Sequence, residues 1–393
     1  MPDRPPSYPA GHRLPWLLGI VTIFIVYGSL YPFVFHPAAV PGDPFGALLG
    51  TWRDWDHRGD LLSNILLYMP FGFLATRTVS SHIPAILRIA LAILAGTLLS
   101  ASMETAQLYD ADRVTSMGDV YANAIGSALG ALVAALFGTG TRWPLVRELN
   151  DHPDAALLLA AFLGYRLYPY VPVIDRHKYI GAVRGLLEQP IPPPADLARF
   201  VVTWLFIAVV VESLYGFLRW TVLFPLLAGG VFLARIIIDG LTLTAADVAG
   251  AALAFVLWAA PLRGLPRRPV GLACLFALLI IALRLQPFTF SRVPLHAFGW
   301  VPFWSLMHGS IGVAIQAFLE KFYQYGGLIW LLRRAGLSLP AATLLTAGLL
   351  LGTSYAEIYL PGRSGEMTDA AMALTIGMAF GLLDSVNAAR AIR

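Results

Sequence analysis

Three pairs of polar side chains have the spacing of neighbours on one face of a helix. They are Asp60 with Asn64, Glu104 with Gln107, and Asp119 with Asn123. Residues three or four positions apart lie side by side on a helix surface. Carboxylates placed in this way can act as general acid and base, or they can hold a divalent cation. The pairs therefore mark a candidate site for chemistry or binding.

Arg113 stands between the second and the third pair. A guanidinium binds phosphate or carboxylate with strong, directed hydrogen bonds, so Arg113 predicts an anionic ligand. Glu104 and Asp119 are the candidate catalytic residues, because ionisable groups at membrane depth are costly unless they are paired or functional. The structural alternative stays open: Asp119 caps a helix, Arg113 neutralises Glu104, and the amides bind neighbouring helices.

The composition decides which solvent surrounds these residues. Of 393 residues, 58% are hydrophobic and 13% are charged, whereas soluble proteins have about 25% charged residues. Apolar stretches of the length that crosses a bilayer recur along the whole chain. The sequence therefore predicts an all-α, polytopic integral membrane protein built as a helical bundle, with membrane lipids as its surroundings.

Several other classes of function are disfavoured. Cys274 is the single cysteine and lies in an apolar stretch, which excludes intrachain disulfides and Cys-rich metal sites. No HExxH-like spacing joins the histidines, so no metal site is predicted, and no cofactor is indicated. The arginines lie in short segments between apolar runs, where they report topology and not nucleic-acid binding.

The boundaries of the apolar runs predict about twelve transmembrane spans. These lie near residues 14–34, 61–76, 84–108, 118–138, 155–171, 197–218, 221–238, 244–261, 269–288, 308–332, 339–360 and 368–384. The span at 61–76 is short and is interrupted by Met69-Pro70, which leaves open a kinked or re-entrant segment.

Arginines in short loops set the orientation of a membrane protein. Arg77, Arg219 and Arg333 fall on one side of the predicted spans, together with both chain termini. We therefore place both termini in the cytoplasm. The three polar pairs then lie near the opposite, outer surface.

An internal repeat is indicated by recurring motifs. The ends of the first, fifth and ninth spans read LYPF at 30–33, LYPY at 167–170 and LQPF at 285–288. Each copy later reaches an aspartate that precedes a helix rich in small residues: Asp119, Asp247 and Asp369. The predicted organisation is a tail at 1–13, repeats of four helices at 14–140, 150–262 and 268–385, and a tail at 386–393.

The three copies differ in their polar residues. The third copy keeps Glu357, Arg363 and Asp369, but it has Ser354 where the first copy has Glu104, so it predicts a second, altered ligand site. The second copy has Leu241 in place of the arginine and apolar or basic residues in place of Glu104 and Gln107. Its site is predicted to be structural.

The first copy resembles the VanZ-like family. The residues that carry the resemblance are Asp60-Leu-Leu-Ser-Asn64, Pro70-Phe-Gly72, Glu104-Thr-Ala-Gln107, Arg113 and Asp119-Val-Tyr-Ala-Asn123-Ala-Ile-Gly126. The resemblance covers roughly residues 20–138 and extends to about 270–384. It implies a membrane protein of a bacterial cell envelope, in the inner membrane. The family's name comes from an accessory protein associated with resistance to teicoplanin, a glycopeptide antibiotic, and it implies no particular reaction.

Four functions follow as hypotheses. The leading one is binding of an anionic, lipid-linked glycan or cell-wall precursor by the outer cluster, with a link to envelope polysaccharide or glycopeptide resistance. The first alternative is a hydrolase or transferase acting on such a substrate. The second is a transporter or flippase, which predicts polar groups through the whole bilayer. The third is a non-catalytic membrane scaffold.

Overall fold

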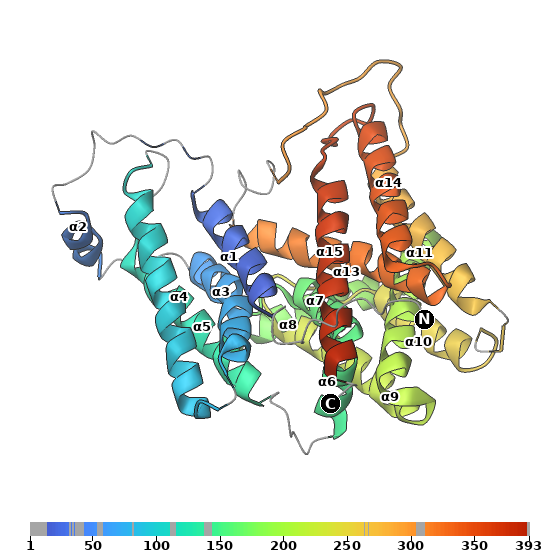
Figure 1. Cartoon of the computed structure of the whole chain (residues 1–393). Coiled ribbons are helices and arrows are strands. Elements are labelled where there is room, and N and C mark those ends of the chain that lie inside the picture. Colours follow the sequence, from blue (N-terminus) through green and yellow to red (C-terminus); the bar gives the residue numbers. More distant parts are fainter. Residues whose placement is uncertain are drawn as a thin grey trace, which may run out of the picture. The chain divides into compact units, whose positions relative to one another are not determined.

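The computed structural model is helical throughout the part of the chain that it describes (Figure 1). It describes residues 14–30, 33, 35, 43–52, 58–80, 82–110, 115–136, 144–262, 264–265, 267–303 and 311–390. The only β-structure among these residues is three isolated bridges. Two compact units are present. Unit 1 contains the chain up to Arg147 with short pieces at Gly309–Gly312 and Leu382–Arg393, and unit 2 contains Glu148–His308 and Val313–Gly381.

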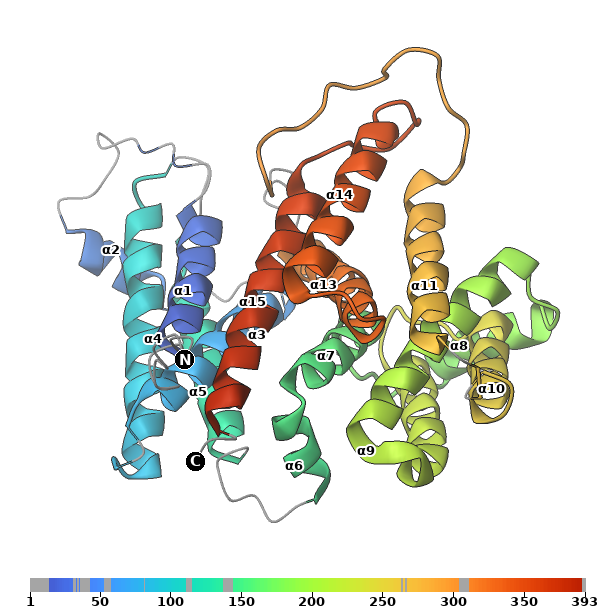
Figure 2. The ribbon, with the colours of Figure 1, turned by 45° about the vertical axis from the view of Figure 1, so that its right-hand side comes forward.

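Unit 1 contains a bundle of four helices and a short additional helix. These are α1 (Leu14–Leu30), α2 (Pro44–Gly50), α3 (Arg58–Thr78), α4 (Ala85–Gln107) and α5 (Met117–Leu136). Helices α1, α3, α4 and α5 lie together, as both views of the ribbon show (Figure 2). Ile25, Tyr68, Phe71, Ala92 and Ala131 form their apolar core.

Glycines bring α3 and α5 into backbone contact. A Cβ atom at Gly126 would overlap the carbonyl oxygen of Ile65, and one at Gly130 would overlap that of Met69. Gly72 of α3 lies equally close to the backbone at Ser127. Small residues allow membrane helices to approach in this way. Gly126 and Gly130 therefore allow the close packing of α5 against α3.

The predicted break in the second span is absent. Helix α3 runs without interruption through Pro70. A helix of this length covers about 31 Å at 1.5 Å per residue, which matches the thickness of the hydrocarbon core. The backbone therefore gives no support to a re-entrant segment at 61–76.

Unit 2 contains the remaining long helices. They are α7 (Pro153–Leu167), α8 (Arg176–Glu188), α9 (Pro194–Ile237), α10 (Ala245–Ala259), α11 (Arg268–Leu285), α13 (Ile311–Arg334), α14 (Leu339–Glu357) and α15 (Thr368–Arg390). The first two residues of α13 and the end of α15 from Leu382 belong to unit 1. The helix α9 is a hairpin and not one rod. Gly216 has a φ of 74° and a ψ of 165°, which interrupts the helix, and the Trp204 ring lies 5.6 Å from the Phe232 ring in the second half. The two halves match the predicted spans at 197–218 and 221–238.

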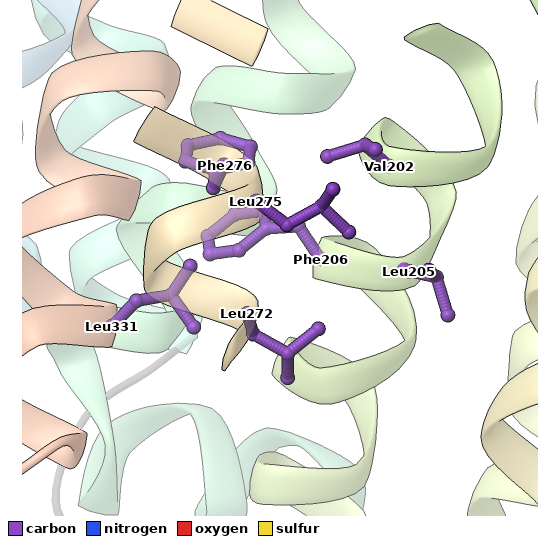
Figure 3. Close-up of a pocket in the computed structure, with 7 residues that line it drawn as sticks. All are labelled: Val202, Leu205, Phe206, Leu272, Leu275, Phe276 and Leu331. Carbon is purple, nitrogen blue, oxygen red and sulfur yellow. The ribbon is translucent and has the colours of Figure 1, made fainter. Parts of the chain in front are cut away.

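Tyr323 of α13 lies at the centre of unit 2. Its ring is 5.4 Å from Phe162 of α7, 5.4 Å from Phe206 of α9 and 5.9 Å from Phe276 of α11. Next to this cluster, α9, α11 and α13 border an apolar recess lined by Val202, Leu205, Phe206, Leu272, Leu275, Phe276 and Leu331 (Figure 3). Every lining side chain is a hydrocarbon, so the recess has no group for polar chemistry.

Four helices in the described part of the chain are long and apolar enough to cross a membrane: α4, α9, α11 and α14. On α4, only 17% of the most apolar window is buried inside the protein. Ile86 and Leu98 are 80% and 59% exposed. Exposed aliphatic side chains on such a helix are stable in lipid and unfavourable in water. Each predicted span coincides with a helix or with half of α9, while the number of crossings stays a prediction.

Among the described residues, three helices lie between the predicted spans. They are α2, α6 (Pro144–Asp151) and α8. The Asp175 side chain accepts a hydrogen bond from the His177 N–H at the start of α8. Lys178 of the same helix donates to the carbonyl oxygens of Arg235 and Leu241, at 3.0 and 2.6 Å. Polar capping residues therefore stabilise helices in these segments, and hydrophobic periodicity does not detect such helices.

The residue after the proline has a positive φ in each of the three Pro motifs. Phe33, Tyr170 and Phe288, each directly after the proline, have φ values of 65°, 60° and 63°. Their N–H groups donate to the carbonyls of Leu30, Leu167 and Leu285 at 2.8, 2.9 and 2.7 Å. A non-glycine residue with positive φ is uncommon. Its occurrence at three matching positions agrees with a repeat, although the triplication itself stays a prediction.

Replacing Gly130 with leucine is expected to destabilise unit 1. The side chain has no space against the α3 backbone, and overpacking of this kind costs about 1–3 kcal/mol. Gly19→Ala in α1 is the matched control, because a Cβ there meets nothing within 4 Å. Thermal unfolding of the detergent-solubilised protein measures both. Equal melting temperatures for the two variants would contradict the backbone contact between α3 and α5.

Candidate functional site

The first-copy cluster is assembled from α3, α4 and α5. Asn64, in the second turn of α3, donates a hydrogen bond from Nδ2 to Oδ1 of Asp119 in the first turn of α5. Asn123, one turn further along α5, donates from Nδ2 to the Ser100 hydroxyl of α4 at 2.9 Å. The sequence therefore predicted correctly that these amides and Asp119 share one region of the bundle.

Glu104 and Gln107 join the cluster from the end of α4. The Glu104 carboxylate accepts the Ser116 N–H at 3.0 Å, which fixes the turn before α5. Gln107 donates from Nε2 to the Ser29 carbonyl of α1 at 2.8 Å. Both side chains are buried. All four helices of the unit 1 bundle thus contribute to the cluster.

Asp119 is not the helix cap that the structural alternative assigned to it. The Ser116 hydroxyl accepts the Gly118 N–H at 3.0 Å and caps α5. Asp119 lies inside the first turn, where a negative charge is favoured by the helix dipole. The second copy has the same arrangement, because Thr244 caps α10 by accepting the Asp247 N–H at 3.3 Å.

One acceptor in the first-copy cluster has no partner in the described part of the chain. Asn123 is 5% exposed, and its Oδ1 atom accepts no hydrogen bond from any described residue. Buried polar atoms are normally paired, since an unpaired one costs about 1–3 kcal/mol. A donor from a ligand or a water molecule satisfies such an atom.

Two predicted site residues lie outside the described side chains. Asp60 is on α3, but only its backbone is described, and Arg113 falls in the segment 111–114 that the structure does not describe. Their roles as ligand-binding residues stay predictions.

The third copy forms a different cluster around Arg284 of α11. Its Nε donates to the Thr353 hydroxyl, Nη1 to Tyr325 and Asp369, and Nη2 to Ser354 and Glu357. The bonds to Thr353, Ser354 and Glu357 are 2.8 Å long. Lys321 of α13 forms a second ion pair with Asp369 at 2.7 Å. Two cations and two carboxylates therefore neutralise one another inside unit 2.

Arg363, predicted to bind ligand beside Glu357 and Asp369, has other hydrogen-bond partners. Its Nε and Nη2 donate to the carbonyls of Gln286 and Leu283, at 3.1 and 3.0 Å. These are the last carbonyls of α11, which lack partners within the helix. Arg363 therefore caps α11.

The second copy also pairs its aspartate internally. Asp247, 1% exposed, binds Arg166 of α7 through Oδ2 and the Trp204 indole N–H through Oδ1, the latter at 2.8 Å. Arg235 is 3.8 Å from the same carboxylate and donates to the Thr242 and Arg166 carbonyls. The Asp247 charge is therefore paired within the second copy, although the buried Nε of Arg166 has no hydrogen-bond partner among the described residues.

Matching positions show how the copies differ. Three residues before the motif proline stand Ser29, Arg166 and Arg284. The aspartate of each copy receives a hydrogen bond or ion pair from the second helix, at Asn64, Trp204 and Lys321 respectively. In the second and third copies the first helix adds a guanidinium to this aspartate, whereas in the first copy it carries only a serine at that position.

Sequence reasoning missed Arg166, Arg284, Lys321 and Tyr325. The signal for the two arginines was present, because each is a basic residue inside an apolar helix and three positions before the motif proline. They were passed over because basic residues were used to locate loops. Lys321 and Tyr325 have no signal apart from their four-residue spacing. No group of three or more His, Cys, Asp or Glu side chains able to hold a metal ion occurs among the described residues.

Comparison with known proteins gives one match. No curated protein and no solved structure matches the chain. Residues 16–138 match the family model described as VanZ/LLP1. The matched region begins in α1 and ends just after α5, so it contains the four-helix bundle and every side chain of the first-copy cluster. Residues 16–138 are therefore a VanZ-like domain within this chain.

Proposed function

We propose that this VanZ-like protein binds an anionic, lipid-linked glycan or cell-wall precursor in the bacterial envelope through its first-copy cluster. The cluster consists of Asp60, Asn64, Glu104, Gln107, Arg113, Asp119 and Asn123. The second and third copies, which we regard as duplicates of the same unit, have a structural role in this proposal.

The observation that supports the proposal most strongly is the difference at the first helix. Arg166 and Arg284 fill the sites of the second and third copies with the protein's own guanidinium groups. Ser29 does not extend to Asp119 in this way, because its side chain is short and its carbonyl accepts from Gln107. In the first copy, helix 1 thus supplies no guanidinium to the aspartate.

The chemistry of the described side chains favours a ligand rich in hydroxyl groups. The Asn123 Oδ1 atom is a buried acceptor without a partner among the described residues, so it matches a hydroxyl donor. Carboxylates and amides supply further acceptors and donors nearby. Arg113, in the segment that joins α4 to α5, supplies a cation for a phosphate. A sugar attached to a lipid through phosphate has all of these groups.

The described contacts also favour one rival, a purely architectural cluster. Asn64, Glu104, Gln107 and Asn123 each bond to a group of the same bundle, and such bonds hold helices together in a membrane. In that case the protein acts as a scaffold.

Two other functions use the same residues differently. A hydrolase or transferase employs Glu104 or Asp119 as general base, with Arg113 on the phosphate. A transporter requires polar groups along a path through the bilayer. The two clusters described here lie at helix ends near the turns, which favours binding or catalysis at one membrane surface over transport.

Charge removal in the first copy is expected to abolish function while the protein remains folded. A deletion strain is complemented with wild type, Glu104→Gln, Asp119→Asn or Arg113→Ala. Growth and the composition of envelope glycans are measured, together with membrane abundance. Glu104→Gln and Asp119→Asn preserve shape, so we expect normal abundance and at least a tenfold loss of function, which corresponds to about 1.4 kcal/mol of lost binding free energy.

The outcomes separate the candidate functions. Full complementation by normally abundant variants would show that the cluster is architectural. If Glu104→Gln retains ligand binding but accumulates unprocessed precursor, the protein is an enzyme.

Removing the Arg284 guanidinium is expected to reduce the stability of the protein. Arg284→Met leaves Asp369 and Glu357 buried with one cation fewer, and breaking a buried ion pair costs about 3–5 kcal/mol. We expect low membrane abundance and a lower melting temperature in detergent. Arg292→Gln, which removes the same charge from an exposed loop position, should change stability by less than about 0.5 kcal/mol. An Arg284→Met variant as stable as the wild type would contradict the structural role that we propose for the third copy.

A further inference from the structure

A polar hollow lies beside the end of α14, apart from both buried clusters. It has a volume of about 360 Å³, and it is lined by His296, Ala297, Gly299, Gly362, Arg363, Ser364, Gly365 and Glu366. Small-molecule sites have volumes of about 300–1,000 Å³. The lining residues come from two segments, the long loop after α11 and the turn between α14 and α15, which both lie beyond the end of α14 in Figure 1.

The walls of the hollow are fixed by backbone hydrogen bonds between these segments. The N–H of Leu295 donates to the Ile358 carbonyl, and the N–H of Gly299 donates to the Gly365 carbonyl, both at 2.8 Å. The N–H of Met367 returns a bond to Gly299 at 2.9 Å. Thr368 links the rim further, since its hydroxyl accepts the Phe303 N–H at 2.8 Å. Hydrogen bonds between the two segments therefore hold the walls of the hollow in place within unit 2.

The hollow carries one cationic and one anionic side chain. Two of the three Arg363 nitrogens are held by the end of α11, and Nη1 donates to no residue in the described ranges. The Glu366 carboxylate is oriented by the Thr368 hydroxyl, which donates to Oε2 at 3.0 Å. A guanidinium N–H binds phosphate, and a carboxylate binds an ammonium group. Opposite charges in one hollow match a zwitterion better than a simple anion.

The position of the hollow indicates a lipid as the source of this zwitterion. Glu357, the last residue of the candidate membrane span α14, is only a few residues from the lining segment that starts at Gly362. Exposed aromatic rings stand nearby: Trp300 is 71% exposed and Tyr355, on the last turn of α14, is 57% exposed. Phe298 lies between them, 4.8 Å from Trp300 and 6.5 Å from Tyr355. Exposed Trp and Tyr at the end of a span mark the level of lipid headgroups.

We propose that this hollow binds the headgroup of a phosphatidylethanolamine-type lipid, with the phosphate on Arg363 and the primary ammonium on Glu366. His296 lies at the exposed side of the same hollow. The assignment concerns the third copy and does not depend on the ligand proposed for the first-copy cluster.

The test compares three lipids with identical acyl chains on the purified full-length protein in detergent. Phosphatidylethanolamine, phosphatidylcholine and phosphatidylglycerol are added separately, and the bound lipid is counted by native mass spectrometry. The choline headgroup has the positive charge but no N–H donor, and the glycerol headgroup has no positive charge. We expect phosphatidylethanolamine to bind about tenfold more strongly than either, the ratio that corresponds to one hydrogen bond between charged groups. Equal binding of the three lipids would overturn the proposal.

Matched variants identify the residues responsible. Glu366→Gln keeps the shape of the side chain and should reduce the preference for phosphatidylethanolamine over phosphatidylcholine to about one. Arg292→Gln changes a charge in the same loop outside the hollow and should leave the preference intact. A preference that survives Glu366→Gln would place the lipid elsewhere. Displacement of the bound lipid by an equal concentration of glycerophosphoethanolamine, which lacks acyl chains, would assign the hollow to a soluble phosphoester instead.

Discussion

An aspartate in the first turn of α5, α10 and α15 is the constraint that the surrounding helices satisfy. Asp247 and Asp369 are buried, and Asp119 is partly buried. An ionised carboxylate in a bilayer is costly unless hydrogen bonds and opposite charges surround it. Asp247 and Asp369 receive an arginine from the first helix and a donor from the second. These bonds connect helices that are distant in sequence, so the same groups that neutralise the charge also determine how the bundle packs. The positive end of the helix dipole adds to the stabilisation.

The close packing of α3 against α5 follows from the same requirement. Asn64 and Asp119 bond only if these two helices approach closely, and Gly126 and Gly130 permit that approach. A larger residue at either glycine separates the helices and lengthens the polar contact. Apolar packing and the polar cluster in unit 1 are therefore coupled, and a functional test of the cluster has to include a measurement of stability.

Much of this could be predicted from the sequence, because hydrophobic length and helical spacing are local signals. The helices and the polar pairs within single helices depend on residues close in sequence. The proximity of Asn64 to Asp119, 55 residues apart, was expected from the predicted orientation of the spans. Partners distant in sequence could not be predicted in the same way. Arg284 is 73 residues from Glu357 and 85 from Asp369, and nothing local shows that α11, α13, α14 and α15 direct their polar atoms to one point. The contacts of Arg363 could not be predicted for the same reason, because its partners at the end of α11, Leu283 and Gln286, are 80 and 77 residues away in sequence.

In our proposal, the residue three positions before the motif proline distinguishes the two structural copies from the copy that binds a ligand. Arginine at this position provides a permanent counter-charge with up to five donors, and a ligand has to displace it at the full cost of leaving a carboxylate unpaired. Serine provides no such charge, so helix 1 does not contribute a counter-charge to Asp119. A cluster that has only to hold helices together gains from a permanent arginine, as the second and third copies illustrate. The retention of serine in the copy that also keeps Glu104, Gln107 and Asn123 is therefore the feature that a purely architectural role explains least well.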